Sequence, residues 1–431
     1  MVGHVGIAFA TLEEATLITN AVPSDPTRTA AAFGSAAPSA GLRGLRRGNM
    51  SLVAKSLLQR GALARADIAT VTGLSPTSVT KITAQMMRAH LLTELSAVSG
   101  DPGRPRVPVA LDTTHYRFLG IHIGLRRTTG GLLDLAGNVV TEQAITHRRQ
   151  GQKAILNEVR ELRTALEDAA GGRERVLGTG VATGGRVNPA AGVVVDHPVL
   201  GWKDLHIAEQ LDSGEHMLLV DNSVRAMALA ESYLGVTRDV RSSLLLFIGN
   251  IVGAGFMLDG RLRQGHDDAA GTIDHLPVGD GVAPSVCPCG RTDCLASVAT
   301  DVAVLKRARD TGVVRPRASF ESLVSRSRSG DEQATHLLRE RAIRAGTAAA
   351  LLLDLVDPDL LVLGGGLLQT PEYLEDLRAS AANRLSRPEA AERILPTGLG
   401  RGSLVRGSAS LVMDAFFTDP VGVLPSLVGT G

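Results

Sequence analysis

The sequence has few cysteines and few aromatic residues, and it has no long run of apolar side chains. Three of its 431 residues are cysteine, and aromatic residues make up 3%. So few cysteines exclude a disulfide framework of the kind that holds small secreted domains together. The apolar segment 348–356 is short and contains Asp354, which favours a buried helix over a membrane span. Because the N-terminus also has no basic segment before an apolar core, we expect a cytoplasmic protein without a signal peptide or membrane segment.

The three cysteines are clustered within eight residues, at Cys287, Cys289 and Cys294, and His275 lies twelve residues before the first of them. A disulfide would leave one thiol unpaired, and a bridge between Cys287 and Cys289 would be strained. Three thiols and one imidazole supply the ligands of a tetrahedral zinc site. Because four protein ligands leave no open position for water, we predict a structural zinc ion and not a catalytic one.

Positive charge is concentrated in one segment. Residues 41–106 contain ten Lys or Arg and three acids, whereas the formal net charge of the whole chain is +1. This asymmetry indicates an anionic partner such as nucleic acid, although a solvated basic surface would show the same charge. The basic residues are Arg43, Arg46, Arg47, Lys55, Arg60, Arg65, Lys81, Arg88, Arg104 and Arg106.

The same segment has the turn residues of a winged helix-turn-helix. Gly61 and Gly73 each end a helical pattern, and Ser75-Pro76 is a strong helix start. A Gly/Pro-rich tip between two short strands is typical of a wing. The expected elements are helices over 46–59, 65–72 and 76–89 and strands over 91–95 and 107–111.

The third of these helices has two distinct faces. Val79, Ile82 and Met86 share an apolar face, and the opposite face carries small hydroxyls and cations that can approach bases and phosphates. At the stiff wing tip, Arg104 suits a narrow minor groove. A winged helix used for protein contacts is the alternative. The residues predicted to contact double-stranded DNA are Arg65, Ser75, Thr77, Ser78, Thr80, Lys81 and Arg104.

From residue 116 the pattern changes to buried strands followed by helices, with glycine at the turns. Units of this kind predict a two-lobed α/β fold with a central cleft. We expect a strand meander over 118–145, a helix over 158–170 and a last helix over 408–416.

With these motifs, the chain resembles the ROK family (repressors, open reading frames, kinases), in particular its xylose-repressor-like regulators. The resemblance spans about residues 43–416. It implies a winged helix followed by an actin-like sugar-kinase domain, a zinc site and a homo-oligomer. The matching motifs are Leu45-Arg-Arg-Gly-Asn49, Thr72-Gly-Leu-Ser75, Gly103-Arg-Pro105, Gly260-Arg-Leu-Arg-Gln-Gly265, Leu363-Gly-Gly-Gly366 and Cys287-Pro-Cys-Gly-Arg-Thr-Asp-Cys294 with His275.

The chain departs from the kinase members of this family at the catalytic positions. Kinases carry an Asn-Asp pair whose Asp is the general base, and here the pair is Asn222-Ser223. A serine hydroxyl does not accept a proton at neutral pH without a base beside it. In the phosphate loop, His122 and Leu125 replace an Asp and a Gly, so we predict no catalytic residue and no kinase activity.

The resemblance also places an effector pocket in the kinase-like domain. Thr272 and Ala296 replace two carboxylates that accept sugar hydroxyls in family pockets, so we expect a changed, sugar-like effector. The alternative to a sugar-like effector is control by a partner protein. Arg225 could reach an acidic ligand. The predicted pocket residues are Gly185, Asn222, Ser223, Thr272 and His275.

The sequence therefore predicts a cytoplasmic, nucleoid-associated transcriptional regulator with an inactive sugar-kinase-like domain. A repressor is favoured over an activator, and a homodimer or homotetramer would bind a palindromic operator. The alternative is an active ROK sugar kinase with an appended DNA-binding domain. The predicted segments are a disordered leader (1–42), the winged helix-turn-helix (43–112), the kinase-like sensor domain (116–416) and a C-terminal tail (417–431).

Overall fold

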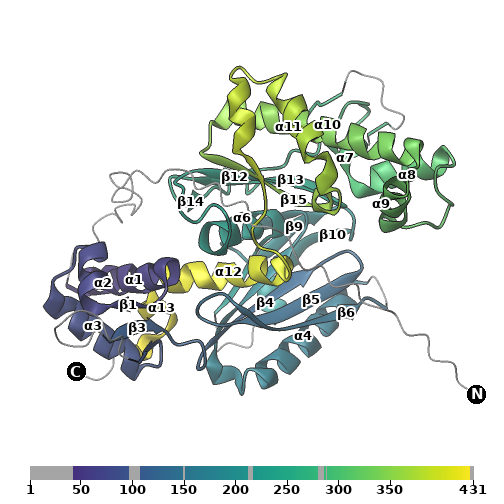
Figure 1. The fold of residues 1–431 in the computed structure, drawn as a ribbon. Coiled ribbons are helices and arrows are strands. Elements are labelled where there is room, and N and C mark those ends of the chain that lie inside the picture. Colours follow the sequence, from purple (N-terminus) through teal and green to yellow (C-terminus); the bar gives the residue numbers. More distant parts are fainter. Residues whose placement is uncertain are drawn as a thin grey trace, which may run out of the picture. The chain divides into compact units, whose positions relative to one another are not determined.

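The N-terminal part of the chain contains three helices and a small antiparallel sheet with strand order β1-β3-β2 (Figure 1). The computed structural model describes residues 42–96, 107–148, 151–211, 217–279, 286–287 and 289–427. The predicted helices and wing strands are all present, and the first helix begins at Leu42 instead of residue 46. The elements are α1 (Leu42–Arg60), β1 (Leu63–Ala64), α2 (Arg65–Thr72), α3 (Pro76–Arg88), β2 (Leu92–Glu94) and β3 (Pro108–Leu111).

Local signals fix the turn between α2 and α3. Gly73 ends α2 with a φ of 69°, which glycine adopts without steric cost. Ser75 then caps α3, because its hydroxyl accepts a hydrogen bond from the backbone amide of Ser78 at 3.2 Å. Pro76 takes the first helical position, where no amide hydrogen is needed. The angle between the two helices thus follows from adjacent residues.

Residues 117–234 form an α/β unit that we call lobe 1. Its five-stranded sheet has the order β11-β7-β4-β5-β6, in which β4, β5 and β6 are the predicted meander. A second sheet, β10-β9-β8, was not predicted because its strands span only three to five residues. The elements are β4 (Arg117–Ile123), β5 (Arg127–Leu133), β6 (Val139–Thr146), α4 (Gln152–Ala169), η2 (Arg173–Arg175), β7 (Val176–Thr183), β8 (Arg186–Asn188), β9 (Val193–His197), β10 (Trp202–His206), α5 (Ile207–Leu211), β11 (Leu218–Asn222) and α6 (Ser223–Leu234).

Residues 243–396 form a second unit, lobe 2, whose sheet has the order β14-β13-β12-β15-β16. Strands β12, β15 and β16 are parallel, and β12, β13 and β14 are antiparallel. The elements are β12 (Ser243–Ile248), β13 (Val252–Leu258), β14 (Arg261–Leu262), α7 (Leu295–Ala299), α8 (Asp301–Asp310), α9 (Phe320–Arg328), α10 (Glu332–Val356), β15 (Leu360–Gly365), η3 (Gly366–Gln369), η4 (Pro371–Tyr373), α11 (Leu374–Ala382), η5 (Pro388–Arg393) and β16 (Ile394–Pro396).

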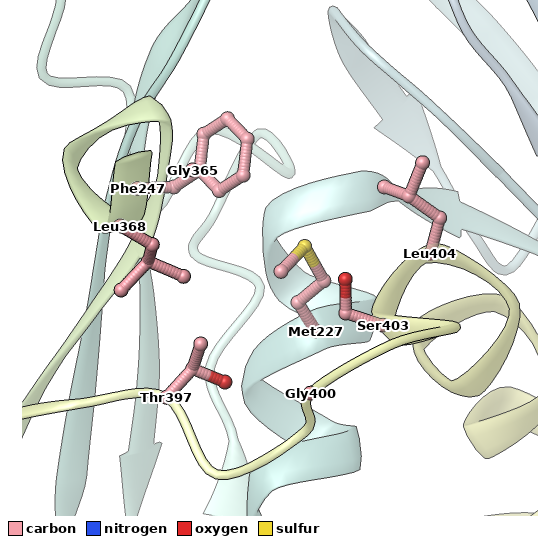
Figure 2. Close-up of a pocket in the computed structure, with 8 residues that line it drawn as sticks. All are labelled: Met227, Phe247, Gly365, Leu368, Thr397, Gly400, Ser403 and Leu404. Atoms are coloured by element: carbon pink, nitrogen blue, oxygen red, sulfur yellow. The ribbon is translucent and has the colours of Figure 1, made fainter. Parts of the chain in front are cut away.

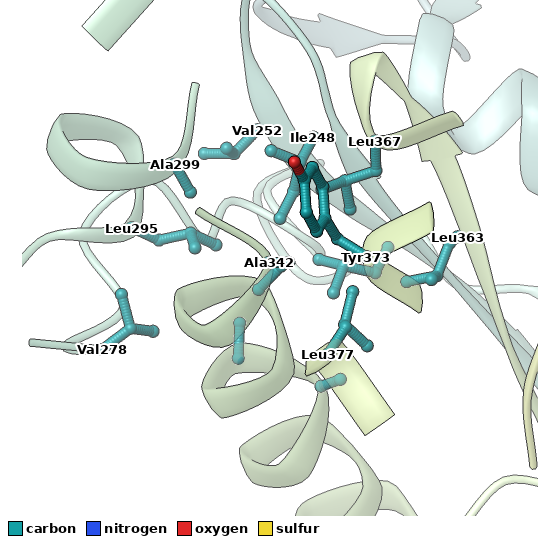
Figure 3. Close-up of a cluster of buried hydrophobic side chains, with 14 of the residues drawn as sticks. Ile248, Val252, Val278, Leu295, Ala299, Ala342, Leu363, Leu367, Tyr373 and Leu377 are labelled. Atoms are coloured by element: carbon teal, nitrogen blue, oxygen red, sulfur yellow. The ribbon is translucent and has the colours of Figure 1, made fainter. Parts of the chain in front are cut away.

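Apolar side chains from this sheet and from the helices around α10 make the core of lobe 2 (Figure 3). Ile248 and Leu363 come from neighbouring strands, and Ala342 of α10 and Leu377 of α11 pack against them. The apolar segment 348–356 lies in α10, and most of its side chains before Asp354 are buried, whereas Leu351 and Leu355 are exposed. In the described part of the chain, no helix is long and apolar enough to cross a membrane.

The helix α12 (Ser403–Thr418) packs directly on the sheet of lobe 1 (Figure 1). Glycines on the sheet make this close approach possible. A methyl group on Gly120 would lie 2.5 Å from the Val405 carbonyl oxygen and 2.7 Å from the Ala409 amide nitrogen. A methyl group on Gly180 would collide with the carbonyl oxygen of Ser408. The backbone of α12, and not only its side chains, therefore contacts the sheet.

The C-terminal residues do not form the tail that the sequence predicted from residue 417. Helix α12 continues to Thr418 and is followed by α13 (Pro420–Val423) and η6 (Pro425–Leu427). Phe417, Val421 and Leu427 are buried and share one apolar cluster with α1 and α3. Pro420 and Pro425 begin the two short helices, because proline suits the first helical position. Residues 1–41, most of the predicted leader, lie outside the described part.

The close seat of α12 can be tested at Gly180. The change Gly180→Ala should lower the midpoint of thermal unfolding, because the added methyl group forces α12 off the sheet at a cost of about 1–3 kcal/mol. Gly48→Ala in α1 is the matched control, since a methyl group there meets no atom within 4 Å. Calorimetry of both variants gives the comparison. Equal unfolding midpoints for Gly180→Ala and the unchanged chain would contradict the close contact between α12 and the sheet.

Candidate DNA interface, metal centre and effector site

The outer face of α3 exposes the residue types that the sequence analysis assigned to DNA. Thr77, Thr80 and Lys81 are exposed, and Arg88 follows them two turns later on the same face. Val79, Ile82 and Met86 are buried on the opposite face, at the spacing of a helix. The helix therefore holds two cations and two hydroxyls in fixed positions toward solvent.

Some of the predicted DNA contacts also have a role within the fold. The hydroxyls of Ser75 and Ser78 lie 2.9 Å apart at the start of α3, and the Thr80 hydroxyl donates to the Pro76 carbonyl at 2.9 Å. Arg65 donates to Glu94 at 2.6 Å and to Thr83 at 3.2 Å, which joins α2 to β2 and α3. In this structure the Arg65 guanidinium is thus already engaged. Arg104 lies outside the described residues.

The four predicted metal ligands come together. One ligand atom from each of His275, Cys287, Cys289 and Cys294 lies within 4.8 Å of the others. The Cys287 Sγ is 3.4 Å from His275 Nδ1, and the sulfurs of Cys289 and Cys294 are 3.5 Å apart. A tetrahedral zinc ion with bonds of about 2.0–2.3 Å places its ligand atoms at similar separations. The residues are therefore close enough together to hold a metal ion.

Backbone hydrogen bonds hold this cluster in shape. The Gly290 amide donates to the Cys287 carbonyl at 2.8 Å, and a φ of 88° at Gly290 makes the tight turn. The Cys287 amide donates to Arg291 at 2.7 Å, and the Leu295 amide donates to Leu276 at 2.9 Å. The bond between Leu295 and Leu276 places Cys294 beside the segment that carries His275. The ligand loop is thus paired with the His275 loop through the backbone.

The thiols of the cluster have different acidities. A hydrogen bond from the backbone amide of Arg291, and a second from its side chain, lower the pKa of Cys289 to about 6. Burial raises the pKa of Cys294 to about 11. Since thiolates are the form that binds zinc, a bound cation would favour ionisation of Cys294 as well.

Three of the predicted effector residues meet at the start of α6. The Asn222 side chain donates to the Gly185 carbonyl at 2.7 Å and accepts from the Val224 amide at 2.8 Å, so it caps α6. Ser223 occupies the first helical position. Its side-chain hydroxyl is buried and has no hydrogen-bond partner among the described residues. The structure thus places a buried polar group without a hydrogen-bond partner among the described residues at the start of α6.

Arg225 is bound within the protein, which differs from the expectation that it could reach an acidic ligand. It pairs with Asp221, and both side chains are almost fully buried. The guanidinium also donates to the Val187 carbonyl at 2.7 Å and to the Asp268 carbonyl at 2.6 Å. Burial raises the pKa of Asp221, and the charge of Arg225 acts against this rise. All three nitrogens of the guanidinium are therefore occupied.

Thr272 and His275 lie on the loop that Arg225 holds. Both are exposed, and Arg225 reaches this loop at Asp268. The Gly271 carbonyl accepts from the Ala254 amide at 2.9 Å, which lays the loop on β13. In the described ranges, no hydrogen bond joins Thr272 or His275 to Asn222. The predicted set is thus divided between lobe 1 and a lobe 2 loop.

The hairpin between β4 and β5 carries an uncharged histidine. Burial, together with the nearby charge of Arg127, lowers the pKa of His122 to about 4. His122 is therefore neutral at physiological pH and supplies no charge to this hairpin.

Sequence reasoning missed an apolar pocket of about 420 Å³ (Figure 2). It lies where α6, the end of β15 and the loop before α12 meet, and none of the predicted effector residues lines it. The buried carboxylate of Glu231 holds this loop by accepting from the Gly398 amide at 3.1 Å and from the Thr397 hydroxyl. No local motif marks the pocket. Its lining is Met227, Phe247, Gly365, Leu368, Thr397, Gly400, Ser403 and Leu404.

The described structure combines an N-terminal segment of three helices and a small sheet with two α/β lobes and a His/Cys cluster that could hold a metal ion. The model of the ROK family matches residues 118–415. A transcriptional regulator of Mycobacterium tuberculosis is 34% identical over 399 residues, which cover 86% of each chain. The chain therefore belongs to the ROK family, as the sequence motifs predicted.

Further similarities agree with this assignment. The DNA-binding transcriptional dual regulator NagC of Escherichia coli is 25% identical over 341 residues, covering 76% of this chain and 82% of NagC. A crystal structure of a ROK family transcriptional regulator, described as a homologue of the Escherichia coli MLC protein, has a TM-score of 0.73. It is 24% identical, and the match covers 89% of this chain and 99% of that one. This last similarity shows a shared fold.

The metal centre makes a prediction for the purified protein. We expect a single zinc ion per chain by atomic emission, and Cys294→Ala should lose it because three ligands bind zinc far more weakly than four. His266→Ala is the control, since His266 lies in the same region with an exposed side chain outside the cluster. An unchanged zinc content in Cys294→Ala would contradict the assignment of the ligands.

Proposed function

We propose that this protein is a DNA-binding transcriptional regulator, more specifically a repressor, whose winged helix reads an operator in double-stranded DNA. The observation that carries the proposal is the exposed face of α3, where Thr77, Thr80 and Lys81 face solvent on a helix buried on its other side. Small hydroxyls contact base edges and phosphates, and cations bind phosphates. Two of its relatives support the same function, a transcriptional regulator of Mycobacterium tuberculosis and the DNA-binding regulator NagC.

The full predicted interface also includes Arg65, Ser75, Ser78 and Arg104. Arg65 would have to exchange its partner Glu94 for a phosphate, or contact DNA with the rest of its guanidinium. A homodimer or homotetramer with two-fold symmetry would place paired α3 helices on a palindromic site. The protein would act on the nucleoid in the cytoplasm, where cysteines stay reduced and available to a metal.

For the metal centre we propose a structural zinc ion held by His275, Cys287, Cys289 and Cys294. Four ligands leave no coordination position for water or substrate, so the ion would cross-link two loops and supply no chemistry. One ligand, His275, lies on the same loop as Thr272. Zinc would therefore fix the loop that forms part of the proposed effector site.

We further propose that the kinase-like domain has no kinase activity and senses a sugar-like effector. The Ser223 hydroxyl has no hydrogen-bond partner among the described residues, so no base is in place to accept its proton. The carboxylate of Asp221, two residues before it, is paired with Arg225. His122 is neutral where a carboxylate would be needed. The effector residues would be Gly185, Asn222, Ser223, Thr272 and His275. Control by a partner protein is the alternative if no sugar binds.

The DNA interface can be tested with a duplex that the protein enriches from a random-sequence library. Lys81→Ala should weaken binding to this duplex and lower the slope of log affinity against log salt by about 1, because one phosphate contact is lost. Lys306→Ala in lobe 2 is the control with an exposed lysine outside the winged helix. Failure of the unchanged protein to enrich any duplex would overturn the proposed function.

Calorimetric titration with a panel of sugars and sugar derivatives, repeated with ATP and magnesium, tests the kinase-like domain. We expect saturable binding heat from a sugar-like ligand and no continuing heat of turnover, because no described residue can serve as the base at Ser223. A known ROK glucokinase serves as the positive control. Continuing heat with an unmodified hexose would support the rival, an active kinase.

A further inference from the structure

The C-terminal segment, defined here as residues 416–427, completes the core of the winged helix. Phe416 and Phe417 are fully buried, with their ring centroids 5.1 Å apart, and share an apolar cluster with Met50 and Val53 of α1. Leu427 belongs to the same cluster. Residues from both ends of the chain therefore form one packed core.

Two polar contacts join this segment to α1. The Ser51 hydroxyl donates to the Phe417 carbonyl at 2.5 Å and is buried. Arg47 donates to Asp419 at 3.1 Å. Asp419 also accepts a hydrogen bond from the Gly422 amide at 3.0 Å, so its side chain caps the N-terminus of α13. The end of α12 is thus attached to α1 by directional bonds as well as by packing.

A third contact reaches α3 itself. The Gln85 side-chain amide donates to the Leu427 carbonyl, and its oxygen accepts from Arg46 at 2.6 Å. Gln85 lies between α1 and the C-terminal segment, on the helix that exposes Lys81. A shift of Leu427 would therefore act directly on α3.

The other end of this connection lies in lobe 1. Phe118 of β4 packs against Phe416 with a centroid distance of 5.7 Å, and Tyr233 of α6 donates to Asp414 at 2.7 Å. Asp414 and Phe416 belong to α12, whose backbone rests on the lobe 1 sheet. Lobe 1 and α3 are therefore connected through α12 and the residues that follow it.

We propose that the C-terminal segment is a positioning element for α3, so that the DNA affinity of the protein is set through the end of α12. The proposal rests on the DNA-binding function proposed above. Gln85 and Asp419 are its positioning residues. They act through the placement of α3 and not through contact with DNA. Their substitution should therefore change DNA affinity more strongly when the C-terminal segment is present to position α3.

The first test compares two truncations of the full chain on the duplex enriched by the unchanged protein. Ending the chain after Asp419 should weaken binding about tenfold or more, because α13 and η6 no longer support α3. Ending it after Leu427 should leave binding unchanged, since the described contacts remain. Zinc content and thermal unfolding show whether the kinase-like domain stays folded. Equal affinity of both truncations would overturn the proposal.

The second test places Gln85→Glu in the full chain and in the chain that ends after Asp419. The carboxylate can still accept from Arg46, but it cannot donate to the Leu427 carbonyl. The added negative charge weakens binding in both backgrounds. We expect a larger loss in the full chain than in the truncated chain, because only the full chain also loses the bond to the Leu427 carbonyl. An equal loss in both backgrounds would mean that the substitution acts through its charge alone, and it would overturn the proposal.

The third test uses charge to separate positioning from simple electrostatics. Asp419→Asn removes a negative charge, which by itself would strengthen binding to DNA. The proposal predicts the opposite, a several-fold loss of DNA affinity, because the ion pair with Arg47 is broken. The amide oxygen of asparagine can still cap α13. Glu372→Gln is the matched control. The Arg328–Glu372 side chains are 55% and 36% exposed, against 53% and 34% for Arg47–Asp419. Stronger binding by Asp419→Asn would overturn the proposal.

The affinity of the unchanged protein for DNA separates a failure of the positioning role from a failure of the proposed DNA-binding function. If the unchanged chain enriches a duplex and the variants behave like it, DNA binding stands and the positioning role is wrong. If the unchanged chain enriches no duplex, the proposed function itself has failed.

Discussion

The contact between the backbone of α12 and the lobe 1 sheet is the constraint on which much of the described structure depends. Gly120 and Gly180 leave room for the carbonyl oxygens of Val405 and Ser408, and no other residue type would. Once α12 lies at this depth, Gly407 meets Met227 of α6, and the last turn of α12 reaches α1. The glycines therefore determine where the kinase-like domain and the winged helix join.

The polar network at the start of α6 holds the kinase-like frame together. The buried pair of Asp221 and Arg225 contributes little net stability, because desolvation offsets most of its attraction. Hydrogen bonds from Arg225 to the Val187 and Asp268 carbonyls nevertheless fix α6, β8 and the Asp268 loop relative to one another. A frame held in this way keeps the neighbouring polar side chains in fixed positions. The zinc ligands would act on the same loop from its other end.

The features that the sequence predicted well are those set by neighbouring residues. Gly73 and Ser75 fixed the turn before α3, and the cysteine spacing indicated a cluster that needed only His275 from nearby. The features that it could not predict depend on distant partners. Gln85 and Leu427 are 342 residues apart, so no local pattern shows that they touch. The apolar pocket likewise combines side chains from α6, lobe 2 and the start of α12.

The position of Phe416 and Phe417 has a consequence for how the protein is made. The ribosome synthesises α1, α2 and α3 first, yet these helices share their core with residues that follow Ser51 by more than 360 positions. Domains usually fold as they leave the ribosome, from the N-terminus onward. Here the winged helix gains its full core only after residues 416–427 have been synthesised. Products of termination before residue 416 would thus carry the basic segment without a finished core.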